Sequence, residues 1–280
     1  MPIYSLTDPG RLRSPALVVA LEGWVNAGEA GTGAADVLAA DARVVATFDS
    51  DALFDYRVLR PTLDFVQGVM EKIVWPQMVV RHRPLLERDL LILTGAEPNW
   101  NWRRLGTDVV DLVLRLGVVE HVSIGGIPWA APHTRPVSVI ATASDRSRLD
   151  PSDERPEGLL RVPAAAVSTI EFAVKQAGVP TSGFWARVPQ YIGAHYHPAV
   201  LALLERISRH LGISIELDSL REEADAQKHQ LDLLAEERPE VKAMIEQLET
   251  LVDQQGEVSG EQLAAEIERF LREQGDDRRG

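Results

Sequence analysis

Cysteine is absent from the 280 residues of this chain. Its absence excludes a disulfide framework, a thiolate nucleophile and a thiolate metal site. No apolar run approaches the roughly 20 residues that a membrane-spanning helix needs. The N-terminal residues do not follow the charged-then-apolar order of a secretory signal. Together these absences predict a cytoplasmic protein.

Lysine is scarce, and the charge is unevenly placed along the chain. There are 4 lysines against 25 arginines, and the net charge is −13. Residues 216–280 hold 19 acidic and 8 basic side chains, a net of −11, which leaves −2 for residues 1–215. An acidic surface repels nucleic acid and anionic membranes, so neither is expected as a partner. The composition predicts an α/β core domain over 1–215 and an acidic C-terminal helical domain over 216–280.

Strand and helix patterns alternate through residues 1–215. Strands are expected at Leu17–Leu21, Arg43–Phe48, Met78–His82, Leu90–Thr94, Val118–Ile127, Val137–Ala143 and Phe184–Val188, and helices at 28–40, 102–116, 163–177 and 198–211. Apolar runs without polar alternation are typical of parallel strands that are buried on both faces. Residues 49–75 give an ambiguous pattern, in which 63–74 fit a short helix. The alternation predicts a three-layer α/β/α sandwich.

The acidic region shows three helical patterns with apolar stripes. Their starts are indicated by a capping box at 219–222, by Pro239 and by a second box at 259–262. Gln227 interrupts the stripe of the first helix. The apolar face of the second helix consists of Val241, Ile245, Leu248 and Val252. Such stripes must cover either the chain's own core or a partner or sister subunit, and the sequence leaves both open.

A glycine-rich turn follows the strand at 17–21. It contains Gly23, Gly28, Gly31 and Gly33 and precedes a helical run. Glycine lets backbone approach a ligand closely, and the N-terminal end of a helix attracts anions. However, the glycines are not in the order of a dinucleotide fingerprint, and Gly28 is followed by Glu-Ala rather than by the Lys and Ser/Thr of a phosphate loop. Tight strand–helix packing is therefore favoured over an anion site, and no cofactor is expected.

Polar and aromatic side chains follow the ends of the predicted strands. In an open α/β sheet, ligands bind outside the carboxyl ends of the strands. Four of the six tryptophans fall in three such loops, whereas an aromatic core would place them inside the elements. These loops form either a pocket with stacking walls or an interface with aromatic anchors. The candidates are Glu22, Trp24, Asn26, Gly28, Glu97, Asn99, Trp100, Trp102, Trp129, His133 and Arg135.

Patterns for catalysis and metal binding are weak. His195 and His197 are a close pair, but no nearby carboxylate or third histidine completes a metal set. We therefore favour an ordinary helix start at this point and expect no metal. Ser123 lacks the G-x-S-x-G elbow of a nucleophilic serine and is expected to be a strand residue. Glu22 and Glu97 are candidates for an acid–base pair, although hydrogen bonds to local loop amides are favoured.

A set of short motifs is spread over almost the whole chain. The motifs are Leu21-Glu-Gly-Trp-Val-Asn-Ala-Gly-Glu-Ala, Leu93-Thr-Gly-Ala-Glu-Pro, Ser123-Ile-Gly-Gly-Ile-Pro, Thr134-Arg-Pro, Ala141-Thr-Ala-Ser, Val188-Pro-Gln-Tyr-Ile, and the Arg-Glu-Glu and Arg-Pro-Glu-Val stretches of the acidic region. In combination they resemble the proteasome assembly chaperone family, and more closely its actinobacterial branch. One segment departs from the family pattern, because residues 155–158 are Arg-Pro-Glu-Gly where the family usually shows Tyr-Glu-Gly-Pro.

This resemblance implies an α/β core of the phosphorylase/hydrolase type with an appended helical domain. It also implies a homo-oligomer, with a trimer as one form. The family is named for eukaryotic members that assist assembly of the proteasome's ring, and no catalytic residues can be carried over to this chain.

Two functions are open on the sequence alone. The preferred one is a non-enzymatic protein-binding or assembly scaffold that acts through the acidic helical region and the Trp-rich loops. The alternative is a small-molecule enzyme or sensor with a nucleoside or phosphate ligand at Gly23–Gly33, Trp100 and Trp129. This alternative hypothesis rests on the analogy of the implied fold with nucleoside phosphorylases. His133 and Arg135 are its only candidate polar cluster.

Overall fold

The computed structural model describes residues 1–254, which form a mixed α/β fold. By their internal contacts these residues divide into two compact units. Unit 1 comprises Met1–Trp24, Ala35–Ser123 and Ala165–Thr181, and unit 2 comprises Val25–Ala34, Ile124–Ala164 and the chain from Ser182 onward. Strand β8 (Glu120–Trp129) begins in unit 1 and continues into unit 2.

Unit 1 contains a mixed sheet in which β2 (Ala16–Glu22) is an inner strand. β2 is parallel to β7 (Asp89–Ala96) on one side and to the first half of β8 on the other. Its first six residues are all buried, which explains the continuous apolar run and confirms the predicted parallel strand. The sheet is not parallel throughout. Antiparallel strands extend it beyond β7 in the order β6 (Met78–Pro84), β3 (Arg43–Phe48) and β1 (Tyr4–Leu6).

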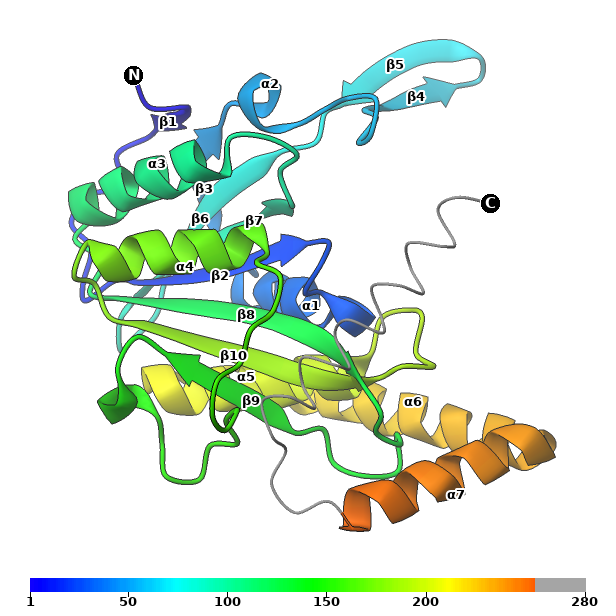
Figure 1. The fold of residues 1–280 in the computed structure, drawn as a ribbon. Helices are drawn as coiled ribbons and strands as arrows, with labels where there is room; N and C mark the ends of the chain where they lie inside the picture. Colours follow the sequence, from blue (N-terminus) through cyan, green and yellow to red (C-terminus); the bar gives the residue numbers. More distant parts are fainter. Residues whose placement is uncertain (255–280) are drawn as a thin grey trace. The chain divides into compact units, whose positions relative to one another are not determined.

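Two helices of unit 1, α3 (Trp102–Arg115) and α4 (Ala166–Gln176), lie side by side (Figure 1). α3 ends before Gly117, which has a φ of 64° and closes the helix as predicted. α4 begins three residues after the predicted start at Pro163, because the first helical N–H finds its acceptor in Glu97. The short helix α2 (Ser50–Leu53) is capped by the side chain of Asp49.

Residues 62–74 form a β-hairpin, so the prediction of a short helix at 63–74 is wrong. β4 (Thr62–Val66) pairs with β5 (Val69–Val74) in a separate two-stranded sheet. Gln67 and Gly68 make the turn with φ of 51° and 83°, the pair of positive values that a type I′ turn requires. Figure 1 shows the hairpin extending away from β3 and β6. Every strand residue is exposed, so no core-facing stripe marks its period.

Unit 2 contains the second half of β8 with β10 (Thr181–Pro189) and β9 (Val139–Ala143), in that order. β9 and β10 are antiparallel. A one-turn helix η1 (Ala27–Glu29) leads into α1 (Ala30–Leu38), which begins in unit 2 and continues into unit 1 after Ala34. Another one-turn helix, η2 (Arg146–Arg148), follows β9. α5 (His197–Leu211) contacts β9 and ends at Gly212 as predicted.

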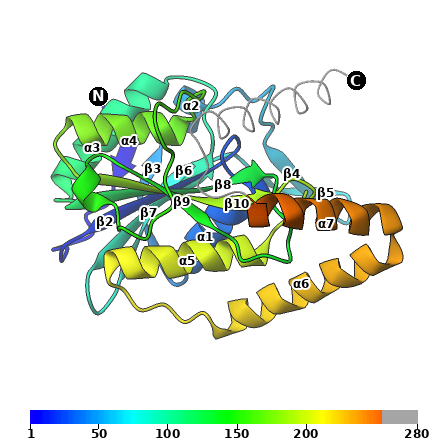
Figure 2. The same ribbon diagram turned by 60° about the horizontal axis from the view of Figure 1, so that its bottom comes forward.

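The acidic helices α6 (Asp218–Glu237) and α7 (Pro239–Gln254) form a helical hairpin in which α6 lies beside α5 (Figure 2). The four predicted apolar positions of α7 are all at least partly buried, as is Glu249, so this stripe is covered by its own chain. α7 begins at Pro239 as predicted. The capping box at 219–222 is wrong, because α6 begins at Asp218, its N-cap residue is Leu217, and the Asp218 N–H donates to the Glu216 side chain at 3.1 Å. The third helix, predicted from 259–262, lies outside the described residues.

Gln227 explains the interruption in the apolar stripe of α6. Its side chain accepts a hydrogen bond from the His197 N–H at 2.8 Å and donates one to the His195 carbonyl at 2.7 Å. The first N–H groups of a helix have no partner within it, so Gln227 satisfies the start of α5 from a neighbouring helix. Within residues 1–254, no helix has the length and apolar character needed to cross a membrane.

Candidate functional site

The candidates in unit 1 hold its loops together through hydrogen bonds. Glu97 accepts a hydrogen bond from the Ala166 N–H at 2.7 Å, at the positive end of α4, and its own N–H donates to the Glu22 carbonyl at 2.9 Å. The Asn99 side chain accepts from the Asp55 N–H at 2.8 Å. Glu97 therefore binds a backbone amide, which was the favoured alternative to an acid–base pair.

Aromatic side chains of unit 1 lie at the surface. Trp100 is 49% exposed and Trp24 is 36% exposed, so neither is the enclosed wall of a pocket. The Trp100 N–H donates to the Leu53 carbonyl. Tyr56, which follows Leu53 by three residues, packs edge-on against Trp75, with ring centroids 4.8 Å apart. For the two Trp-rich loops of unit 1, this arrangement favours an interface over a pocket with stacking walls.

The exposed hairpin β4–β5 ends directly before Trp75, and the sequence analysis did not predict it. A type I′ turn needs positive φ at both central residues, and Gly68 after Gln67 was the available signal. The apolar residues surrounding this turn were assigned helical spacing instead. Asp64 and Lys72 face each other across the strands as an opposite-charge pair, which is typical of cross-strand pairing.

In unit 2, the glycine turn is filled by protein atoms. The Asn26 side chain closes the turn by accepting from the Thr32 N–H at 3.1 Å and donating to its hydroxyl at 2.8 Å. Gly28 has a φ of 60°, and a Cβ atom there would lie 2.9 Å from the Cβ of Tyr196. A Cβ on Gly31 would lie 2.9 Å from the Cα of Gly125. These contacts favour the packing explanation of the glycines.

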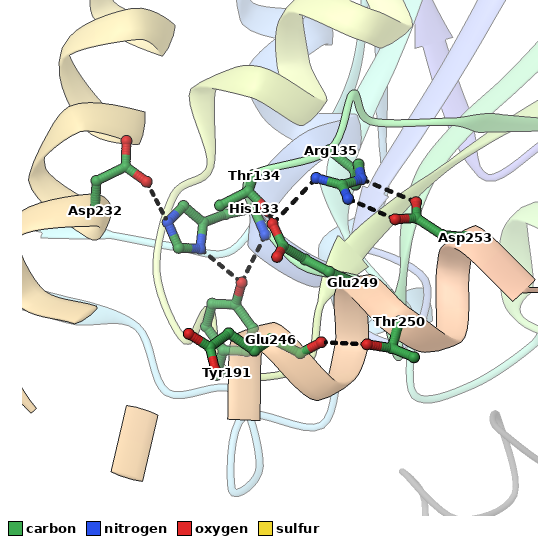
Figure 3. Close-up of polar contacts among 9 residues, drawn as sticks. All are labelled: His133, Thr134, Arg135, Tyr191, Asp232, Glu246, Glu249, Thr250 and Asp253. Carbon is green, nitrogen blue, oxygen red and sulfur yellow. Dashed lines mark hydrogen bonds and ion pairs between the residues drawn. The ribbon is translucent and has the colours of Figure 1, made fainter. Parts of the chain in front are cut away.

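His133 is the centre of a buried hydrogen-bond network (Figure 3). The Tyr191 hydroxyl accepts from the His133 N–H at 2.6 Å and lies 2.8 Å from its Nδ1. Nε2 faces the Asp232 carboxylate and therefore carries the proton of the neutral imidazole, so Nδ1 accepts a hydrogen bond from the Tyr191 hydroxyl. Nε2–H points to Asp232 of α6 at 3.2 Å. Burial lowers the pKa of His133, against the opposing charge of Asp232, so the neutral ring fits this network.

Arg135 lies two residues after His133 in the same loop and binds α7 (Figure 3). Its guanidinium donates to both Asp253 oxygens, at 3.1 and 2.7 Å, and to Glu249 at 3.1 Å. The Thr134 hydroxyl also donates to Glu249, at 2.5 Å. The ion pair lowers the pKa of Asp253 below its ordinary value. We name residues 133–135 the latch loop, because these residues bind both acidic helices to the rest of unit 2.

Trp129 is buried rather than presented to solvent. The guanidinium carbon of Arg187 lies 4.5 Å from the centroid of its ring, a cation–π contact. Beside this pair is a pocket of about 580 Å³, lined also by residues that the sequence did not single out as ligands, among them Ser138, Glu154, Arg155 and Arg187. The pocket lies entirely within unit 2.

The remaining candidates, His195, His197 and Ser123, make contacts within the fold. His195 stands before α5 and His197 is its first residue, and each lies 3.3 Å from a carboxylate, Glu29 and Glu223 respectively. Within residues 1–254, no three His, Asp or Glu side chains are placed to share a metal ion. Ser123 is a fully buried strand residue whose hydroxyl lies 2.9 Å from His121 Nε2, so no substrate reaches it in this conformation.

Comparisons with known proteins give a consistent result. The PAC2 family matches residues 20–235. Mycobacterium tuberculosis Rv2714, a protein of unknown function, is 32% identical with a TM-score of 0.83 over 90% of this chain and 88% of its own. M. tuberculosis Rv2125, a proteasome-assembly chaperone homologue, is 30% identical with a TM-score of 0.76 over 82% of this chain and 99% of its own.

A PAC2 family protein of Streptomyces avermitilis is 32% identical, with a TM-score of 0.73 over 82% of this chain and 99% of its own. No curated protein matches the chain. The family match covers the glycine turn, the Trp-rich loops, the latch loop and most of α6. This chain therefore belongs to the PAC2 family.

Proposed function

We propose that this protein is a non-enzymatic, assembly-chaperone-like scaffold that binds protein through unit 1. The β4–β5 hairpin carries this proposal. Its large apolar side chains are 39% to 64% exposed: Leu63, Phe65, Val66, Val69, Met70, Ile73, Val74 and Trp75. Contiguous exposed apolar surface is typical of interaction sites in soluble proteins. The likeness to a proteasome-assembly chaperone homologue supports the same class of function.

Physical chemistry indicates why this hairpin needs a partner. An isolated two-stranded hairpin is only marginally stable in water. Apolar cross-strand pairs such as Leu63–Ile73 and Phe65–Met70 lie in the open on a sheet of their own. Fully burying a large apolar side chain contributes about 1.5–3 kcal/mol, so covering one that is about half exposed contributes roughly half as much. A second copy of this chain offers a matching apolar surface, so we propose self-association through the hairpin, with a trimer as the form that the family resemblance implies.

The Trp-rich loops and the acidic helices complete the proposal. Trp100 is tied to residues 53–55, and Tyr56 packs on Trp75 at the base of the hairpin, so exposed aromatics continue the apolar surface. The acidic faces of α6 and α7 are proposed as a second contact for a protein partner. We further propose that the core is a three-layer sandwich of the phosphorylase/hydrolase type.

The test is the mass of the purified full-length protein by size-exclusion chromatography with light scattering. We expect an oligomer for the wild type and a monomer for the triple variant Phe65→Ser, Met70→Ser, Ile73→Ser. The matched control changes two polar hairpin residues, Asp64→Ser and Lys72→Ser, and should keep the oligomer. Circular dichroism checks that each variant is folded. A wild-type monomer, or an oligomer that survives the triple substitution, would contradict self-association through the hairpin.

A further inference from the structure

The pocket beside Trp129 has the size and lining of a small-molecule site. Its volume of about 580 Å³ falls within the roughly 300–1,000 Å³ of typical ligand pockets. The apolar part of the wall comes from Pro136, Pro189 and Val252, and the polar part from arginines, carboxylates and Ser138. The residues of the glycine turn do not line it, so this site differs from the one that the sequence suggested.

Arg187 is a buried cation in this wall with too few partners. Its Nη1 donates to Glu154 at 2.7 Å and to Ser138 at 3.0 Å. Its Nε is buried and has no acceptor among the described residues. The side chain is only 12% exposed whereas Glu154 is 49% exposed, and burial lowers the pKa of Arg187. An oxyanion in the pocket would compensate the charge of this mostly buried guanidinium through its accessible edge.

A second arginine of the same wall is available to a ligand. Arg155 is exposed and makes no ion pair or hydrogen bond with residues 1–254. Arg135, the third arginine, is already held by α7. Among the acidic lining residues, Asp153 is bound at both oxygens by Arg206. Glu154 is paired with Arg187, which leaves Glu157 as the carboxylate that an anion would have to avoid.

We propose that this pocket binds a small organic oxyanion, a carboxylate or a phosphate monoester carried on a compact apolar group. Arg155 and Arg187 bind the oxyanion, and Pro136, Pro189 and Val252 contact the apolar part. This ligand site goes beyond the proposed assembly role.

Isothermal titration of the full-length protein with simple probes tests the proposal. Phenylphosphate and benzoate carry the two anions on the same ring, benzamide is the neutral isostere, and inorganic phosphate lacks the apolar part. We expect saturable binding of phenylphosphate or benzoate at one site per chain. Benzamide and inorganic phosphate should each bind at least about tenfold more weakly, the loss expected for roughly one charge-assisted interaction or its apolar counterpart.

Arg155→Gln should weaken binding of the preferred probe about tenfold or more. It is the safer variant, because Arg187→Gln would leave Glu154 without its partner. The matched control Arg161→Gln removes an exposed arginine outside the pocket and should change nothing. Preference for phenylphosphate assigns a phosphate ligand, and preference for benzoate a carboxylate. No saturable binding of either anion up to ~10 mM, equal binding of benzamide, or an unchanged affinity in Arg155→Gln would overturn the proposal.

Discussion

Two hairpins of this protein differ in how they are held. The β-hairpin β4–β5 is apolar, forms a sheet of its own and exposes all of its strand residues. The helical hairpin α6–α7 is acidic, and yet it is docked on its own unit by its apolar stripe and by the latch loop. Burial of apolar surface is the main driving force of docking. The exposed apolar side chains of β4–β5 are therefore the surface that we propose to bind another chain.

The same comparison changes the interpretation of the acidic region. Its charge alone suggests a solvated face that waits for a partner. The structure instead directs Asp232, Glu249 and Asp253 into contacts with residues 133–135 of the same chain. Part of the acidic charge thus serves internal docking. The proposed partner-binding role of these helices therefore rests mainly on their other carboxylates.

The largest effect on docking is expected from Tyr191→Phe. Loss of the hydroxyl leaves the His133 N–H and Nδ1 buried without partners, which should cost about 1–3 kcal/mol. Hydrogen exchange of the α6 and α7 amides should accelerate accordingly. Tyr56→Phe is the matched control, because its hydroxyl binds Asp51 at an exposed site. Equal exchange in the two variants would show that the buried network does not hold the helices.

Acidification should produce a smaller effect of the same kind. Because burial lowers the pKa of His133, the undocked state takes up its proton first, near the ordinary pKa of about 6.5. The contribution of neutral His133 to docking is therefore fully present above about pH 6.5 and decreases as the pH falls below that value. The groups that face the ring are Tyr191, Lys228, Asp232 and Glu249.

The measurement is hydrogen exchange of α6 and α7 at about pH 7.5 and about pH 5.5, corrected for the intrinsic rates. The pKa of Asp253 is held low by Arg135, so that carboxylate stays charged across this window. His133→Gln is the control, since it does not titrate. A pH dependence that persists unchanged in His133→Gln would assign it to another group.

The smallest effect concerns the β-hairpin. Gln67 has a φ of 51° at the first central position of a type I′ turn, where asparagine is preferred. Gln67→Asn should stabilise the hairpin by roughly a few tenths of a kcal/mol, and Gln67→Val should destabilise it. Hydrogen exchange of the β4 and β5 amides provides the readout. Identical exchange in both variants would mean that contacts other than the turn determine this hairpin.

Much of the fold could be predicted in the segments where burial determines the spacing of apolar residues along the chain. The run Leu17–Leu21 is apolar because a parallel inner strand is covered on both faces, and α3, α5 and α7 begin or end at the glycines or proline that mark them. The helix at 63–74 was mispredicted because no core selects one face of an exposed hairpin. The start of α4 was missed because its cap, Glu97, lies far away in the sequence.

For the candidate site, the sequence alone determined the residue types and their loops: tryptophans after predicted strands, a glycine turn, a histidine and an arginine in one loop, and a segregated acidic region. Only the tertiary structure decided which of these meet. It buried Trp129 under Arg187, closed the glycine turn around Asn26 and brought α7 to Arg135, more than a hundred residues away in the chain. Such pairings depend on distance in space and on desolvation, and neither quantity is encoded in local sequence pattern.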